Sequence, residues 1–187
     1  MPTGKAVANI IYLDTNIILD YTDRRDNASI HLLETLRNKK RWKCSSSVFT
    51  MMELCDVKKD HLFFQNTYVK NKWTIDKFLR ERYNRNLVKS DFDDITGYVR
   101  NVKETLKFID FLYLTEDGWK IALQLSTTTN LRTADCIQLA TAITLQCNSL
   151  VTKDKFFQDV VKELNDKSEN EIIKIKSPQV LTEEIEK

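Results

Sequence analysis

The 187-residue sequence has few residues that interrupt regular structure, with only three Gly and two Pro. Because Gly and Pro are common at tight turns and helix breaks, their scarcity favours long helices. No apolar run approaches the ~20 residues that a membrane-spanning helix needs, and residues 1–8 contain a Lys but no long apolar core. We therefore expect a helix-rich protein with no membrane span and no secretory signal, in the cytoplasm.

Cysteine is also scarce, and the four residues Cys44, Cys55, Cys136 and Cys147 include no C-x-x-C pair. This spacing argues against a zinc site and favours reduced, buried thiols over a disulfide framework. The net charge of +2 and the pI of about 8.3 are too mild for overall charge to indicate nucleic-acid binding. Any basic surface must come from local clustering.

The pattern of apolar segments predicts an α/β fold in one domain spanning residues 1–187. Short strand-like runs alternate with helical segments, and they lie at residues 9–13, 42–46, 111–114, 150–152 and 171–176. Because parallel neighbours need crossover connections, this alternation favours a three-layer α/β/α arrangement with a mostly parallel sheet. Residues 58–110 are interpreted as a helical insertion, and the acidic tail at 177–187 is expected to be loosely held.

Two acids directly follow predicted strands, Asp14 after residues 9–13 and Asp154 after residues 150–152. In parallel sheets, ligands bind beyond the carboxyl ends of the strands. We therefore expect these two acids together at this edge of the sheet, the rim formed by the carboxyl ends of the strands. Glu53 lies in a predicted helix after the second strand, and Asp135 lies at the start of another. From these positions both side chains can lean over the rim, which predicts a pocket of four carboxylates.

Carboxylates gathered at short range repel one another unless a cation neutralises them. Since no His or Cys ligands are grouped with the acids, their hard oxygens favour Mg²⁺ or Mn²⁺ over zinc. Such an ion can activate water and neutralise a phosphodiester, so phosphodiester hydrolysis is the matching chemistry. Taken singly, each acid is also explained as a helix cap, a first-turn residue or a solvated residue. The apolar neighbours of Glu53 and Asp135 favour partnered acids instead.

Four segments in chain order carry a family resemblance, namely YLDTNIILD at 12–20, SSVFTMMEL at 46–54, LRTADCIQLATA at 131–142 and LVTKDKFF at 150–157. With them the sequence resembles the PIN-domain nucleases, and most of all the VapC-type toxins. The resemblance covers most of residues 9–157, with about 56–110 matched only as helices. It implies a PIN-like fold in which the catalytic and metal-binding acids are Asp14, Glu53, Asp135 and Asp154, supported by Asn16 and Thr152.

The sequence departs from this family pattern just after Asp154. Many members carry a further acid there, whereas this chain has Lys155, Phe156 and Phe157. The departure implies a weaker second metal position.

The resemblance also implies an activity and partners. The activity is that of a Mg²⁺- or Mn²⁺-dependent endoribonuclease, in which a metal-activated water attacks in line and leaves a 5′-phosphate and a 3′-hydroxyl. The implied biological role is the toxin of a type II toxin–antitoxin pair, acting as a homodimer and bound by an antitoxin. Two alternatives stay open, a housekeeping RNA-processing PIN nuclease and a catalytically silent PIN-fold binding module. A haloacid-dehalogenase-like phosphatase is disfavoured, because it needs a second acid where Asn16 stands.

A basic and aromatic stretch is the candidate RNA-binding surface, with Lys72, Arg80 and Arg82 as its proposed contacts. Between residues 70 and 89, seven basic residues stand against two acidic ones, and aromatic residues are interleaved with them. This combination suits single-stranded or structured RNA, since cations follow phosphates and aromatic rings stack on bases. The alternative is that Phe78 and Tyr83 are core contacts of helices whose basic face is solvated.

Overall fold

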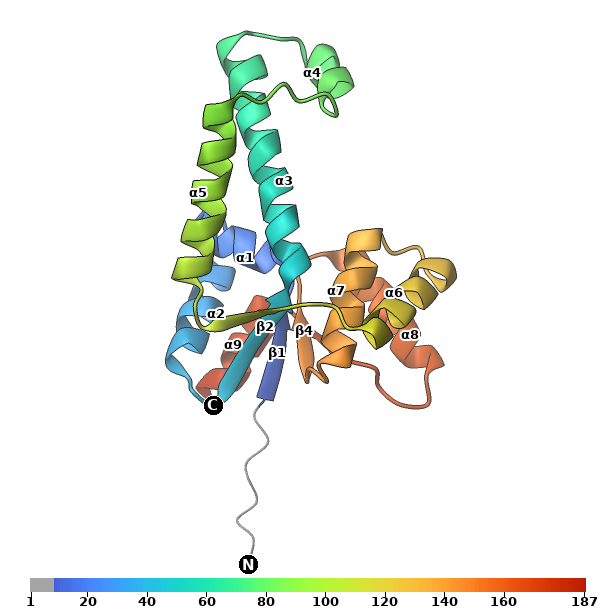
Figure 1. The fold of residues 1–187 in the computed structure, drawn as a ribbon. Coiled ribbons are helices and arrows are strands. Elements are labelled where there is room, and N and C mark those ends of the chain that lie inside the picture. Colours follow the sequence, from blue (N-terminus) through green and yellow to red (C-terminus); the bar gives the residue numbers. More distant parts are fainter. Residues whose placement is uncertain (1–8) are drawn as a thin grey trace, which may run out of the picture. The chain divides into compact units, whose positions relative to one another are not determined.

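The computed structural model describes residues 9–187 (Figure 1), so the interpretation of residues 1–8 falls outside the described part. Within it the strands are β1 (Asn9–Leu13), β2 (Trp42–Ser47), β3 (Ile109–Leu112), β4 (Ser149–Val151) and β5 (Lys174–Lys176). The helices are α1 (Thr15–Thr22), α2 (Asn27–Asn38), α3 (Val48–Phe64), the π-helical η1 (Gln65–Lys70), α4 (Ile75–Glu81), α5 (Lys89–Thr105), α6 (Glu116–Thr128), α7 (Thr133–Thr144), α8 (Lys155–Lys167) and α9 (Pro178–Glu186). None of these helices is both long enough and apolar enough to cross a membrane.

The five described strands form one sheet in the order β3-β2-β1-β4-β5, and every neighbouring pair is parallel. Strand β1 lies at the centre, with Tyr12 opposite Ser45 of β2 and Leu13 opposite Val151 of β4. From Ile10 to Leu13 the central strand is apolar, and its last three residues are buried, as expected for a strand covered on both faces. The predicted parallel α/β sheet is confirmed.

Helices cover both faces of this sheet, which confirms the three-layer arrangement (Figure 1). One layer contains α1, α2 and α9, and the other contains α6, α7 and α8. On the second face, Tyr12, Leu139 and Phe157 are fully buried in one apolar cluster that joins the sheet to α7 and α8. The fold therefore holds the carboxyl ends of β1 and β4 between two packed helical layers.

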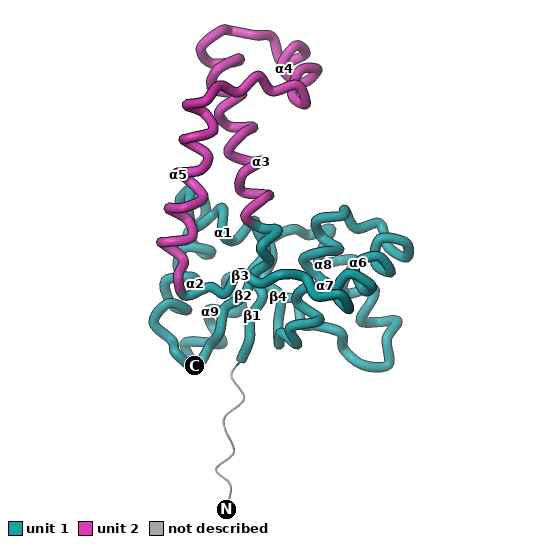
Figure 2. Tube along the Cα trace, in the orientation of Figure 1, with its two compact units in different colours: residues 1–50, 108–187 teal, residues 51–107 magenta. Residues whose placement is uncertain are grey.

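The chain divides into two compact units (Figure 2), residues 51–107 and the remainder of the described chain. The unit of residues 51–107 contains η1, α4, α5 and most of α3, and its aromatic rings pack on one another. The Phe63 ring stacks on Phe78 with centroids 5.4 Å apart and meets Trp73 edge-on at 5.9 Å. The predicted helical insertion at 58–110 overlaps this unit. Its first boundary lies earlier because α3 runs unbroken from Val48 to Phe64.

The expectation of a loosely held tail at residues 177–187 is wrong, because this segment forms helix α9 and packs against α2. Ser177 caps the helix by accepting a hydrogen bond from the Val180 N–H, and Pro178 occupies the first turn, where its missing N–H costs nothing. Leu181 and Ile185 are buried one turn apart, while the acids face solvent. The apolar spacing of one helical face therefore outweighs the acidic composition.

All four cysteines lie within the described residues and are free thiols. Burial raises the pKa of Cys44 and of Cys147 to about 12, so both stay protonated near neutral pH. The prediction of buried thiols holds for Cys44, Cys136 and Cys147, whereas Cys55 is only half-buried.

Candidate active site

Asp14 lies at the carboxyl end of β1 and is also the N-cap of α1. Its Oδ1 accepts a hydrogen bond from the Thr15 N–H at 2.6 Å, and its Oδ2 accepts from Asn16 Nδ2 and Thr152 Oγ1, both at 2.6 Å. Three donors hold this buried carboxylate in one orientation. Capping and placement at the rim are therefore compatible uses of the same side chain.

Thr152 connects Asp14 to Asp154 through a single hydroxyl group. Besides donating to Asp14, Thr152 Oγ1 accepts from the Asp154 N–H at 3.0 Å and from Asn16 Nδ2 at 3.0 Å. This contact arises because β1 and β4 are parallel neighbours with Leu13 opposite Val151, so the residues just beyond them are adjacent. The two residues expected to support the site, Asn16 and Thr152, both touch Asp14.

Asp154 and Asp135 are joined by the guanidinium group of Arg132. Arg132 Nε donates to Asp135 Oδ2 at 3.1 Å, and Nη2 donates to Asp154 Oδ2 at 2.7 Å. The Asp135 carboxylate, and then that of Asp154, raise the pKa of Arg132 above its usual value. The Asp154 Oδ1 separately accepts from the Phe157 N–H at 3.2 Å and so caps α8. Arg132 belongs to a motif singled out in the sequence, but its contacts with two acids were not anticipated.

A buried hydrogen-bond network lies beneath the acids and centres on Gln138 of α7. The Tyr12 hydroxyl donates to Gln138 Oε1, while Gln138 Nε2 donates to Thr15 Oγ1 at 2.8 Å and to Thr50 Oγ1 at 3.2 Å. These contacts tie β1, α1 and the first residues of α3 to α7. Because Gln138 lies one helical turn after Asp135, they also fix the helix that carries this acid. The sequence signal for the network was a Gln inside an apolar helix, since a buried amide requires partners.

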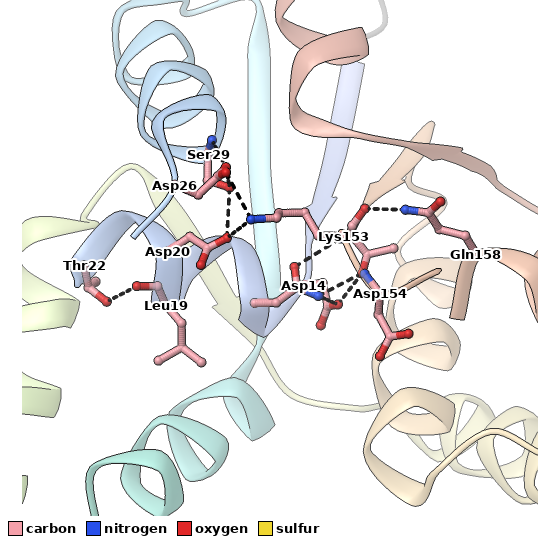
Figure 3. A network of polar contacts seen from close by, with 11 residues as sticks. Asp14, Leu19, Asp20, Thr22, Asp26, Ser29, Lys153, Asp154 and Gln158 are labelled. Carbon is pink, nitrogen blue, oxygen red and sulfur yellow. Dashed lines mark hydrogen bonds and ion pairs between the residues drawn. The ribbon is translucent and has the colours of Figure 1, made fainter. Parts of the chain in front are cut away.

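Lys153 forms a second cationic contact beside the site, on the side of α1 and α2 (Figure 3). Its Nζ lies 2.7 Å from Asp20 Oδ2 and 3.1 Å from Asp26 Oδ1. The Lys153 side chain therefore extends toward these acids rather than toward the Asp154 carboxylate. Hydrogen bonding to Asp20 raises the pKa of Lys153. A hydrogen bond from the Ser29 N–H lowers the pKa of Asp26. One lysine thus forms ion pairs with two acids next to the rim.

The fourth predicted acid and the predicted RNA contacts belong to the other unit. Glu53 is a half-buried residue of α3 within residues 51–107, and its membership of the acid group stays a prediction. In the same unit, Lys72, Arg80 and Arg82 are all exposed, and Arg82 is also ion-paired with Asp60.

The two aromatic residues named in the core-contact alternative differ in their surroundings. Phe78 packs on Phe63 and Phe64, as that alternative requires. Tyr83 is 87% exposed, so that alternative is wrong for this residue.

The acids fit a hard divalent cation by their chemistry. Among residues 9–187, no group of three or more His, Cys, Asp and Glu side chains is arranged to hold a metal ion. Asp14, Asp135 and Asp154 nevertheless offer carboxylate oxygens, the ligands that Mg²⁺ and Mn²⁺ prefer. One edge of the Arg132 guanidinium reaches both Asp135 and Asp154, so a single cation can contact both. The structure thus brings the carboxylates of Asp135 and Asp154 to one cationic group, and Thr152 links Asp14 to Asp154.

The described strands form a parallel α/β sheet with acids just beyond two central strands, which is the edge where ligands bind in proteins of this class. The PIN domain family matches residues 11–163, and the chain belongs to this family, as its motifs predicted. A similar solved structure is a chain in the crystal structure of VapBC2 from Rickettsia felis bound to a DNA fragment from their promoter. The match has a TM-score of 0.55 and covers 90% of this chain and 98% of that chain. At 13% identity, this likeness shows the fold. No curated protein is significantly similar in sequence.

The substitution Thr152→Val tests whether this hydroxyl holds the acidic rim together. It keeps the side-chain shape but removes a donor to the buried Asp14 carboxylate, so we expect the free energy of unfolding to fall by about 1–3 kcal/mol. Urea denaturation measures the change. The control is Thr144→Val, since Thr144 Oγ1 donates only to carbonyls of its own helix, those of Ala140 and Thr141. Equal losses in the two variants would contradict a special role for Thr152.

Proposed function

We propose that this chain is a metal-dependent endoribonuclease that hydrolyses phosphodiester bonds of RNA. The observation that carries the proposal is the continuous set of contacts joining Asp14, Asp154 and Asp135 through Thr152 and Arg132. Membership of the PIN domain family supports nuclease chemistry at these acids. In the proposal Asp14, Glu53, Asp135 and Asp154 hold Mg²⁺ or Mn²⁺.

The chain's own groups orient these acids before any ligand binds. Asp14 is held by three donors, Asp154 by the Phe157 N–H, and Asp135 by a helix anchored through Gln138. Carboxylates fixed in this way need little reorganisation when a cation or substrate arrives. When bound, the divalent ion supplies a Lewis acid that activates water and neutralises charge on the phosphodiester. Asn16 and Thr152 act in the proposal as supports that keep Asp14 in place.

A nuclease assay on single-stranded RNA with Mn²⁺ tests the proposal. The variants Asp14→Asn, Asp135→Asn, Asp154→Asn and Glu53→Gln should each cut at least about 100-fold more slowly. The reason is that a lost metal ligand removes several kcal/mol of transition-state stabilisation. Asp166→Asn is the matched control, because Asp166 is an exposed acid of α8 outside the proposed site. A chelator should abolish cutting, and added Mn²⁺ should restore it.

Two outcomes of this assay would contradict the proposal. An inert intact chain would favour the catalytically silent binding module, and equal cutting by all variants would place the activity elsewhere. Loss of activity in the Asp14, Asp135 and Asp154 variants but not in Glu53→Gln would remove Glu53 alone from the acid group.

Within this activity we propose the role of toxin in a type II toxin–antitoxin pair. The likeness in fold to a chain of the VapBC2 complex supports this role, together with an antitoxin partner and a homodimer. A cytoplasmic location is part of the same proposal, because the RNA substrate and the antitoxin would be met there. A housekeeping RNA-processing nuclease is the alternative with the same chemistry.

Controlled expression in a bacterial host separates the toxin from the housekeeping enzyme. Induction of the intact chain should arrest growth because cellular RNA is cut, whereas Asp14→Asn at equal protein level should not. Optical density and viable counts measure the effect. Normal growth with a chain that is active on RNA in vitro would exclude the toxin role and leave the nuclease proposal standing.

For the RNA contacts we propose Lys72 and Arg80 as the principal cations and Arg82 as a weaker one. Arg82 already pairs with Asp60, and Lys77 lies over the Trp73 ring at 4.1 Å, so both are partly engaged. The double substitution Lys72→Ala with Arg80→Ala should weaken binding and reduce the salt slope for single-stranded RNA by about 1.4, or ~0.7 for each lost phosphate contact. Fluorescence anisotropy at several salt concentrations measures both.

Two single substitutions act as controls for this binding experiment. Arg82→Ala should have a smaller effect than either Lys72→Ala or Arg80→Ala. Arg24→Ala, which removes an exposed ion pair of residues 9–50, should leave the slope unchanged. Unchanged binding in the double variant would assign residues 70–89 to structure.

A further inference from the structure

The Arg132 side chain occupies the carboxylate oxygens that a divalent cation would need at the proposed metal site. Arg132 is the N-cap residue of α7, but its side chain makes no capping hydrogen bond. Instead, the two nitrogens on one edge of its guanidinium contact Asp135 and Asp154, two acids of the proposed metal site. A divalent ion between these carboxylates and the guanidinium in its present place would compete for the same oxygens, Asp135 Oδ2 and Asp154 Oδ2.

The exposure of the three side chains indicates how easily this contact can open. The Arg132 side chain is 70% exposed, whereas those of Asp135 and Asp154 are 12% and 27% exposed. Ion pairs made by an exposed arginine contribute little to stability, because water and salt screen them. Moving Arg132 into solvent is therefore inexpensive, while leaving two close carboxylates without a cation is not.

The acids do not depend on Arg132 for their positions. Asp154 is held by the hydrogen bond from the Phe157 N–H and through the Thr152 contact to its own N–H. Asp135 lies in the first turn of α7, where the helix dipole favours a negative charge. If the guanidinium left, the two carboxylates would stay in place for another cation.

We propose that Arg132 is a resident counter-ion, which neutralises Asp135 and Asp154 in the metal-free protein and is displaced when a divalent ion binds. This inference rests on the proposed function, because it takes these two acids as metal ligands. Its consequence is reciprocal: Arg132 lowers the affinity for the ion, and the ion frees Arg132 from both acids. The residue thereby sets the concentration of divalent ion at which the site fills.

Mn²⁺ titration by calorimetry on the full chain is the first test. Arg132→Gln should bind Mn²⁺ roughly five-fold more tightly than the intact chain, the change expected when two exposed ion pairs no longer have to be broken. Arg132→Lys keeps the charge but lacks the fork that spans both acids, so its affinity should lie between the two. Equal or weaker binding by Arg132→Gln overturns the inference.

Lys153→Gln is the matched control for the calorimetry. It removes the same charge one residue from Asp154, but Lys153 contacts Asp20 and Asp26 instead. It should change the affinity much less than Arg132→Gln. If the two variants gain equally, general electrostatics explains the effect and displacement is overturned.

A Mg²⁺ titration followed by NMR of the arginine side-chain Nε–H groups tests displacement directly. The Arg132 signal is identified by its absence in Arg132→Gln. We expect it to move toward the position of solvated arginines as Mg²⁺ is added, while the Arg24 signal stays where it is. An Arg132 signal that does not respond to saturating Mg²⁺ overturns the inference, even if Arg132→Gln binds Mn²⁺ more tightly.

These measurements separate failure of the inference from failure of the proposed function. If the intact chain binds Mn²⁺ and cuts RNA but Arg132→Gln binds no more tightly, the inference fails and the nuclease proposal stands. If neither protein binds Mn²⁺ at millimolar concentration and the intact chain is inert on RNA, both fail together.

Discussion

The parallel pairing of β1 with β4 is the constraint on which the described site depends. With Leu13 opposite Val151, the first residues beyond the two strands become neighbours, and the Thr152 hydroxyl meets the Asp14 carboxylate. A slip of one residue in this register would turn the buried side chains of β4 to the other face and break that contact. The packed cores on both faces hold the register, so the position of the acids follows from the apolar residues of the strands.

The fold tolerates several close carboxylates because each has a local structural use. Asp14 and Asp154 cap the helices that follow their strands, and Asp26 caps α2. Capping places backbone N–H donors against carboxylate oxygens, so each of these acids has a hydrogen-bond partner at the start of the helix that follows it. A role as a helix cap and a role as a metal ligand are therefore compatible for the same acid. A strand that passes directly into a helix puts the capping residue at the rim.

How much could be predicted from the sequence differs between the sheet and the contacts around it. The apolar runs, the acids after them and the apolar residues of α7 are local patterns, so the α/β fold and the positions of Asp14, Asp135 and Asp154 could be predicted. The partners of Arg132, Gln138 and Lys153 come from other elements, and no local spacing specifies them. The two serines at the end of β2 differ in the same way. Ser47 accepts a hydrogen bond from the nearby Phe49 N–H, whereas the buried Ser46 donates to the Leu13 carbonyl of the neighbouring strand, a contact set only by strand pairing.

Charge balance around the rim connects the fold to the proposed chemistry. Two cationic side chains form ion pairs with four carboxylates: Lys153 contacts Asp20 and Asp26, and Arg132 contacts Asp135 and Asp154. Three neutral donors, the Thr15 N–H, Asn16 Nδ2 and Thr152 Oγ1, orient the Asp14 carboxylate. Each of these two cations shares one positive charge between two carboxylates, so the repulsion between the paired acids is only partly offset. An external cation is the simplest way to lower that electrostatic cost, and the exposed arginine is the cation that it could most easily replace.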